Sequence, residues 1–589
     1  MAPSLRLEDI CIEPFPDNSD ATKQLVQGVV RRTFTHQQQV TQLIQQRGAD
    51  PNAALWLRAR GSGTIGLAYR LLSLTFDNLS DDTMPTVWAR DRKDSNHRDR
   101  VRPVALPLWS SAELQTAVME ALIDGGADVD ATVTRWSLYT RPIEMAIRAG
   151  NEAAVTILLA RNAAVKGRDP DGYWPPYVMP LPTPMTFAHL GHQVSREYEQ
   201  RLMSIYRLLI QHDATVATEQ DVLGLNPIHL AARLECGHYS QAFIDSYLDL
   251  LVQHGASLTL EPQNWWTPLQ DAALEGSPCV VDYLSRHLPP GTIDREGGRG
   301  DGPPLAVAAG QLNAAIEDSQ DNDLPQEVRD REETKEYFSA RISTQEATIR
   351  SLLRAGADIG RMEGRMHVHR QLVLPQYAAV LNEVPTAAMA AVNAALRPQR
   401  SLAAFLMKSL PTLLPHLMEP PHTGTPPANP PPLPAPPGYG PHEAEAIGWK
   451  IAAMCFDWDA ALTTISHSLP FRNSTLARRV TAAAAHFVDA AMYAISSREV
   501  VGGMANLGGV TVPPLCFAIN GGQHGGHRLL GLCEVVHRAR LDEAAQHGIQ
   551  EGAINKGFNT HFGAGDSPFQ WEQLGYIDED GDFESLDID

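Results

Sequence analysis

Three groups of residues have the types and the spacing that could support chemistry, and the first is a glycine-rich loop. Its sequence is Gly61-Ser62-Gly63-Thr64-Ile65-Gly66, which fits the pattern of dinucleotide-binding loops. Such a site needs a strand before the loop, a helix after it and an acid on the ribose, here Asp77. The segment before the loop is short, and Thr64 stands where a repeat helix is expected to begin. We therefore predict no cofactor at this loop.

The second group consists of histidines and cysteines. His524 and His527 flank two glycines and lie between Cys516 and Cys533. A zinc site needs four ligands in closely spaced pairs, and the gaps of eight and six residues on the two sides are outside the usual patterns. We predict no metal here and expect the glycines to form a tight turn.

The third group is the acidic C-terminal end. Asp578, Asp580 and Asp582 alternate as in a calcium loop, but the glycine stands at position 581 and no Glu occupies the closing position. The sequence also contains no phosphate-binding loop and no Ser or Cys in a recognisable nucleophile motif. We therefore predict no catalytic residue, and the protein is not expected to be an enzyme.

Composition restricts the partners. The formal net charge is −21, and a surface this acidic repels phosphate backbones, so we expect no direct nucleic-acid binding. The basic stretch at residues 90–102 is interrupted by three aspartates and is expected to be a solvated loop. We find no stretch that approaches a membrane span and expect no membrane association. The six cysteines are too few and too scattered for a disulfide framework, which favours a reducing compartment.

The strongest signal is a helix ending that recurs along the chain. Runs containing Leu or Ile end in a Gly-Ala-Asp step, and glycine there can take the left-handed conformation that stops a helix. Softer versions occur at residues 162–164, 213–215 and 255–257. The residues that define this step are Gly48, Asp50, Gly126, Asp128, Gly255, Gly356 and Asp358.

A second recurring phrase marks helix starts. Proline is followed four residues later by alanine, and proline suits the first turn of a helix because its missing N–H would have no partner there. Alanine one turn later lets a neighbouring helix approach closely. The phrase begins at Pro142, Pro227, Pro268, Pro304, Pro375 and Pro514.

Two of these segments resemble the ankyrin repeat, whose unit is about 33 residues long. They are Thr267-Pro268-Leu269 and Pro227-Ile228-His229-Leu230-Ala231-Ala232. The resemblance implies an all-α fold, an ankyrin-type helical repeat solenoid with irregular insertions, followed by a Pro-rich segment and a further helical region. It also implies that His229 bonds the backbone near its own helix start and that a concave face of inner helices and loop tips binds a protein partner.

The predicted organisation has seven parts. They are an N-terminal segment at 1–35, ankyrin-like repeats at 36–310, an acidic insertion at 311–340, further ankyrin-like repeats at 341–410, a Pro-rich linker at 411–441, a helical region at 442–550 and a C-terminal tail at 551–589, acidic from 578. The linker has 13 prolines in 31 residues, which favours extended polyproline II. The helical region is either a decayed continuation of the repeats or a separate domain.

Candidate partner-binding residues lie at loop tips and in the tail. Trp136, Tyr139 and Trp265 precede predicted helix starts, and exposed aromatic side chains anchor interfaces. In residues 576–589 acids alternate with bulky residues that include Phe583 and Leu586. This pattern resembles acidic activation segments, which stay disordered until they fold on a coactivator. A solubilising acidic end explains the same pattern equally well.

These observations favour a non-enzymatic interaction scaffold. We expect a transcriptional coregulator in the nucleus that reaches promoters through a DNA-binding partner. In style the diverged repeats resemble filamentous-fungal ankyrin proteins, some of which regulate secondary-metabolite genes. One alternative is a cytoplasmic adaptor, for instance in a ubiquitin-ligase or trafficking complex. The other is an enzyme with an unrecognised site in residues 442–575.

Overall fold

The computed structural model divides the chain into two compact units. The N-terminal unit comprises residues 1–352 and 361–372, and the C-terminal unit comprises residues 353–360 and 373–589. The residues that the structure describes are 4–14, 18–62, 66–77, 85–93, 99–131, 141–166, 194–234, 237–262, 266–289, 291–297, 302–320, 332–362, 367–417, 441–492, 505–507, 510–512, 515–520, 527–556, 569–578 and 580–588.

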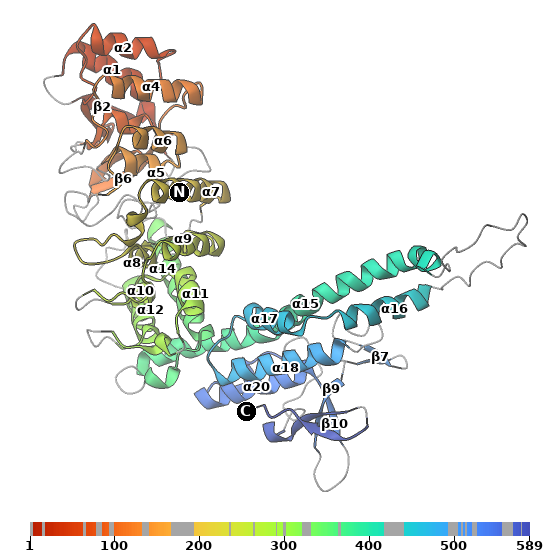
Figure 1. Ribbon diagram of the computed structural model, residues 1–589. Coiled ribbons are helices and arrows are strands. Elements are labelled where there is room, and N and C mark those ends of the chain that lie inside the picture. The colour runs from red at the N-terminus through yellow and green to blue at the C-terminus, as the bar shows by residue number, and fades with distance from the viewer. Residues whose placement is uncertain are drawn as a thin grey trace, which may run out of the picture. The chain divides into compact units, whose positions relative to one another are not determined.

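Helices fill most of the N-terminal unit and form two columns (Figure 1). The first column contains α1 (Asp20–Arg31), α3 (Leu71–Leu74) and α5 (Pro142–Arg148), which contact one another in that order, and then α8 (Pro227–Leu234), α10 (Pro268–Glu275) and α12 (Pro304–Gln320). The second column contains α2 (Gln37–Gln45), α4 (Ala112–Asp124), α6 (Glu152–Ala160), α7 (Arg196–His212), α9 (Gln241–Gln253) and α11 (Pro278–His287), each in contact with the next. The long helix α14 (Glu332–Arg354) is joined to α12 by the Arg341–Asp318 ion pair.

Local sequence explains where these helices begin and end. Proline occupies the first turn of α5, α10 and α11, and at α10 the side chains of Thr267 and Gln270 form a reciprocal capping box. The left-handed endings that the sequence predicts are present: φ is +68° at Gly48, +99° at Gly126 and +94° at Gly255. At residues 162–164, where Asn162 replaces the glycine of the Gly-Ala-Asp step, Asn162 adopts the same left-handed conformation. Asn tolerates this conformation better than most residues.

Side chains connect one helix ending to the next in what we call the turn ladder, whose members are Asn52 with Gly126 and Asp128, Asp130 with Ala164, and Lys166 with Asp213. Asn52 Nδ2 donates to the Gly126 carbonyl at 2.8 Å, and Asn52 Oδ1 accepts from the Asp128 N–H at 2.7 Å. Asp130 then accepts from the Ala164 N–H at 2.9 Å. Each helix pair is thereby held to its successor at the turns as well as through its apolar core.

The described part of the N-terminal unit also contains a six-stranded sheet, so the all-α prediction is wrong. Its strands are β1 (Leu5–Arg6), β2 (Ile10–Pro14), β3 (Ala54–Ala59), β4 (Leu67–Arg70), β5 (Trp88–Lys93) and β6 (Asp99–Ala105), in the order β1-β6-β5-β3-β2 with β4 paired to β3. Leu55, Leu57 and Ala59 are buried while the residues between them are partly exposed, which is the period of a strand. Thr64, where a repeat helix is expected to begin, lies outside the described residues, and the segment from Leu67 to Arg70 that follows it forms β4 in an antiparallel pair with β3.

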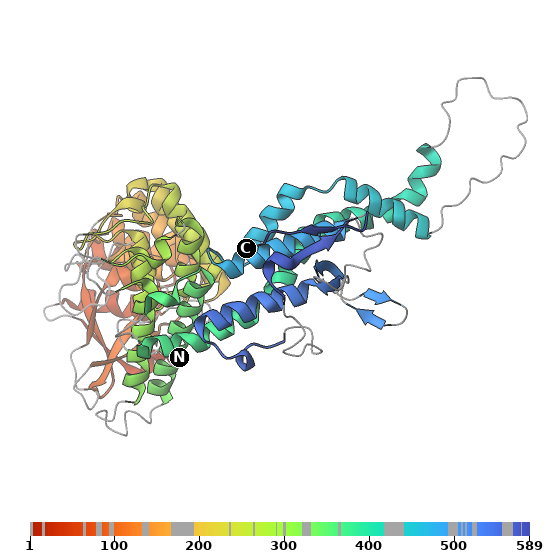
Figure 2. The ribbon, with the colours of Figure 1, turned by 90° about the horizontal axis from the view of Figure 1, so that it is seen from below.

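The C-terminal unit combines long helices with small sheets. Its helices are α15 (His367–Leu417), which begins in the N-terminal unit, α16 (Pro441–Met454), α17 (Trp458–Ser468), α18 (Thr475–Met492) and α20 (Leu532–His547). The strands are β7 (Ala505–Leu507), β8 (Val510–Val512), β9 (Leu515–Ile519), β10 (Arg528–Gly531), β11 (Leu574–Ile577) and β12 (Phe583–Ser585). A sheet of order β10-β9-β11-β12 contains the dark blue strands of Figure 2, and β9 contacts α18 and α20.

Two predicted helix starts in this unit are wrong. Pro375 lies inside α15 and does not begin a helix. The residues that follow Pro514 form β9, which pairs with β10 and β11, so hydrogen bonds to distant segments determine their conformation. Pro514 itself lies outside the described residues, as do residues 418–440 of the Pro-rich linker.

One helix among the described residues has the length and apolar composition of a membrane span, which differs from the sequence expectation. It is the part of α15 from Val368 to Leu410, with a mean hydropathy of 1.2 in its most apolar window, half of which is buried. Within the C-terminal unit this helix packs against α20. The Arg540 guanidinium, fully buried, donates to the Leu381 carbonyl at 2.7 Å and to Asn382 Oδ1 at 2.8 Å.

The acidic tail is folded, so its expected disorder is wrong. β12 pairs with β11 in an antiparallel hairpin, and the Leu586 N–H donates to the Leu574 carbonyl at 3.1 Å. Asp578 Oδ1 closes the turn by accepting from the N–H groups of Asp580 and Asp582. Ile588 is buried. Long-range pairing thus holds a segment whose composition alone suggested an unfolded chain.

The turn ladder predicts a measurable contribution to stability. Replacing Asn52 by Ala removes its side-chain hydrogen bonds to Gly126 and Asp128 and should lower the free energy of unfolding by about 1 kcal/mol. Urea unfolding followed by circular dichroism measures the change, and the exposed Gln46→Ala is the matched control. An Asn52→Ala urea midpoint equal to that of the control would show that the two Asn52 hydrogen bonds contribute nothing to stability.

Candidate interaction surface

The first-column helices α8 and α10 present a polar arrangement that begins with a buried histidine. His229, with 0% of its surface exposed, has its Nδ1 2.7 Å from the side-chain oxygen Oδ1 of Asn226. The backbone contact at its own helix start that the resemblance implies is the longer one, in which the Asn226 N–H donates to Nδ1 at 3.4 Å. Its Nε2 lies 3.2 Å from the Trp266 carbonyl in the loop before α10. Burial lowers the pKa of His229 to about 4, so the ring is neutral at pH 7. This histidine links two successive helix starts.

The side chains of Arg233 and Asp271 form an ion pair between α8 and α10. Arg233 Nη2 lies 3.1 Å from Asp271 Oδ1, and none of the Asp271 side chain is exposed. Burial raises the pKa of Asp271 to about 6, although the Arg233 charge acts in the opposite direction. Asp271 Oδ2 has no hydrogen-bond partner among the described residues.

Helix α14 contributes an amide beside this pair. Gln345 Nε2 donates to the Leu274 carbonyl at the end of α10, at 2.9 Å. A Cβ at Gly276 would lie 2.9 Å from the same nitrogen, and φ at this glycine is +82°, so the position requires glycine for both space and conformation. Gln345 Oε1 has no hydrogen-bond partner within the described ranges. We refer to Arg233, Asp271 and Gln345 as the inner polar cluster.

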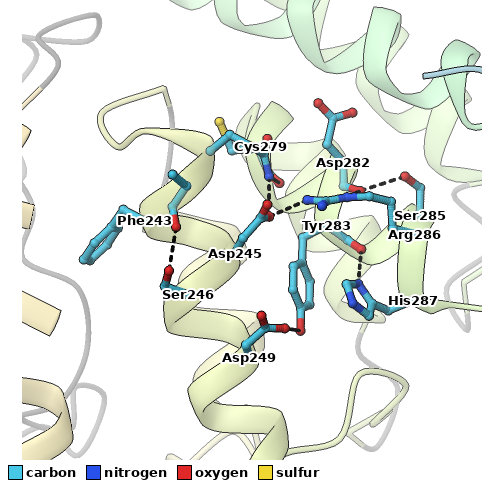
Figure 3. Close-up of polar contacts among 12 residues, drawn as sticks. Phe243, Asp245, Ser246, Asp249, Cys279, Asp282, Tyr283, Ser285, Arg286 and His287 are labelled. Atoms are coloured by element: carbon cyan, nitrogen blue, oxygen red, sulfur yellow. Dashed lines mark hydrogen bonds and ion pairs between the residues drawn. The ribbon is translucent and has the colours of Figure 1, made fainter. Parts of the chain in front are cut away.

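Successive second-column helices are held together by a different set of polar contacts (Figure 3). Asp245 of α9 pairs with Arg286 of α11, and the Tyr283 hydroxyl donates to Asp249 at 2.9 Å. Burial and the Asp249 carboxylate raise the pKa of Tyr283, so this hydroxyl stays protonated and remains a donor. These contacts keep α9 and α11 in register, while the inner polar cluster lies on the other column.

The loop-tip aromatic residues that the sequence predicts as partner contacts cannot be placed. Trp136, Tyr139 and Trp265 lie outside the described residues. The two predicted tail contacts are placed, and both take part in the fold of the tail. Phe583 stacks on His527 with ring centroids 5.7 Å apart, and Leu586 follows β12 with its N–H bonded to β11.

The structure also describes the strands on either side of the glycine-rich loop and the surroundings of Cys516, one of the candidate zinc ligands. The loop connects β3 with the antiparallel strand β4, so the helix that a dinucleotide site requires is replaced by a strand. The Cys516 carbonyl lies 2.8 Å from His486 Nε2, and burial raises the pKa of the Cys516 thiol. No group of three metal-ligating side chains occurs among the residues that the structure describes.

Sequence reasoning missed the inner polar cluster for a physical reason. Arg233 and Asp271 are 38 residues apart, and nothing in either local sequence shows that α8 and α10 lie side by side. A signal was nonetheless present, because an ionisable residue in the middle of the apolar run Pro268–Ala273 needs a partner.

Likeness to known proteins is found among solved structures. No family model matches the chain, and no curated protein matches it. Among solved structures, the chain is similar to the crystal structure of the human ASB11 ankyrin repeat domain, with 16% sequence identity, a TM-score of 0.26, and coverage of 44% of this chain and 93% of that chain. At this TM-score the likeness carries no argument.

Asp271 and His229 are expected to make the stability of the protein depend on pH in opposite directions. Between pH 4 and 6 the native state binds more protons than the unfolded state at Asp271, so this residue makes stability fall as pH rises, by at most about 1.4 kcal/mol per pH unit. At His229 the native state binds fewer protons, so stability rises with pH from about 4 to 6.5. The two contributions partly cancel.

Asp271→Asn should therefore steepen the rise in stability between pH 4.5 and 6.5, because only the His229 contribution remains. Urea midpoints measured across this range test the expectation. Asp124→Asn, which removes a carboxylate that is 57% exposed, is the control for lost charge. The assignment fails if Asp271→Asn and the control have the same pH profile.

Proposed function

We propose that this chain is a non-catalytic scaffold for protein–protein interaction. The observation that supports it best is the turn ladder, because side chains join successive helix endings and hold one helix pair to the next. Such an arrangement stabilises an extended surface without requiring a closed pocket. The resemblance to ankyrin repeats adds that the first-column helices and the loops before them would face the partner.

Within this proposal, the partner contacts the side of the N-terminal unit that carries the inner polar cluster. Arg233, with 21% of its side chain exposed, offers a positive charge on this side, and the buried Asp271 carboxylate holds it in place. Trp136, Tyr139 and Trp265 remain our candidates for apolar anchors at the loop tips.

A more specific form of the proposal is a nuclear transcriptional coregulator that acts through a DNA-binding partner. It is supported by the net charge of −21, which disfavours direct contact with DNA, and by the acids of the tail. Asp580, Asp582 and Glu584 are exposed on the β11–β12 hairpin, so a basic coactivator surface could reach them without unfolding the tail. A role in a fungal secondary-metabolite cluster rests on the resemblance alone.

The scaffold proposal is tested through its loop-tip anchor. Affinity purification of the tagged full-length chain, with partners identified by mass spectrometry, should return a partner whose binding is at least tenfold weaker for Trp265→Ala, since aromatic anchors dominate interface energies. Leu108→Ala removes a side chain that is 61% exposed elsewhere in the same unit and serves as the control. Equal affinities for the two variants would remove Trp265 from the interface.

The coregulator form is tested by removing charge from the tail without unfolding it. Asp580→Asn, Asp582→Asn and Glu584→Gln together should abolish activation of a reporter to which the chain is tethered. The control neutralises Glu551 and Glu572, which are also exposed acids of the C-terminal unit. A reporter that responds identically to both sets, or a chain excluded from the nucleus, would contradict this form and leave the scaffold proposal standing.

A further inference from the structure

The C-terminal half of α15 carries an exposed strip of residues with a distinct chemistry. The strip consists of Arg397, Ser401, Ala404, Phe405 and Lys408, all of them exposed, and Phe405 has 63% of its surface accessible. Their spacing places them on one face of the helix. We call this face the basic aromatic strip.

Packing on the other side of α15 explains why the strip faces outward. Ala403 of α15 is buried in a cluster with Trp449 and Ala452 of α16. A Cβ at Gly448 would lie 3.4 Å from the Ala403 carbonyl, so the two helices approach closely at that point, where they run side by side in Figure 1. Phe405 is two residues beyond Ala403, which turns it about 200° around the helix and away from α16.

The charge of this segment contrasts with that of the whole chain. Residues 384–417 contain no Asp or Glu, whereas the complete chain has a net charge of −21. Within the described residues, neither Arg397 nor Lys408 forms an ion pair. The two cations are 11 residues apart, or about 16 Å along the helix, with Phe405 between them. Two unneutralised cations around an exposed aromatic ring form a surface complementary to an anionic, partly apolar ligand.

We infer that the basic aromatic strip binds an acidic peptide segment of a protein partner, with an apolar residue of that segment packed on Phe405. The occupant is a peptide because one Phe and one Ala bury too little apolar area for membrane insertion, while an exposed aromatic side chain between two cations on one helix face can anchor a protein partner. An anionic bilayer would also meet the negative charge of the rest of the chain. A short peptide meets the local positive field within a Debye length of about 8 Å. This surface is separate from the one in the proposed function.

The test uses the full-length protein and a labelled 18-residue amphipathic helical peptide with Leu and Phe on one face and Glu on the other. Two matched peptides replace every Glu by Gln or by Lys. Fluorescence anisotropy should show binding of the Glu peptide, tenfold or weaker binding of the Gln peptide and none of the Lys peptide. Phe405→Ala should weaken binding of the Glu peptide at least tenfold, and Arg397→Glu with Lys408→Glu should abolish it.

The control is Met454→Ala, which removes an apolar side chain that is 82% exposed on α16. All changed residues are exposed, so circular dichroism melting should be the same for every variant. Equal binding of the Phe405→Ala and Met454→Ala variants overturns the inference, as does failure of all three peptides to bind. Two further results would also overturn it. If the protein sediments with phosphatidylserine vesicles and Phe405→Ala prevents this, the strip binds lipid. If the protein is a dimer and Phe405→Ala makes it a monomer, the strip binds a second copy of the chain.

Discussion

The N-terminal unit depends on how each helix pair is ended and then joined to the next. A helix leaves its last carbonyl groups without partners, and a left-handed residue such as Gly126 turns the chain so that some of them are satisfied. That turn also exposes backbone groups to the neighbouring pair, where Asn52 and Asp130 bind them. The same backbone groups end one helix pair and bind the side chains that position the next pair. The conformation of each turn therefore also determines how neighbouring helix pairs are placed.

The C-terminal unit holds long helices and short strands around a buried cation, the guanidinium of Arg540. Arg540 is fully buried, and carbonyl and amide oxygens of Leu381, Asn382 and Asn555 accept its hydrogen bonds. Burial lowers the pKa of Arg540 to about 10, so the guanidinium remains charged at pH 7 and these oxygens compensate for lost hydration. Removing any one acceptor would leave part of that cation unsatisfied, which makes the three residues interdependent.

Features set by neighbouring residues could be predicted from the sequence, whereas those set by distant pairing could not. The left-handed turn at Gly48 and the capping box of Thr267 need only a few adjacent residues, and both are present. The six-stranded sheet was missed because β3 pairs with β2, some 45 residues earlier, and composition records no pairing. The tail was missed for the same reason: its acids suggested disorder, while β11 supplied the partner strand. The inner polar cluster likewise depends on the packing of α8 against α10.

The position of β12 at the edge of its sheet has a consequence for the behaviour of the chain in concentrated solution. An edge strand exposes unpaired backbone groups to which another chain can add, and this is a common route to aggregation. Here the edge is only three residues long, and the exposed acids Asp582 and Glu584 stand on it or beside it. A second copy of the same edge would bring like charges together. The acidic end of the chain thereby protects the sheet to which it belongs from uncontrolled strand addition.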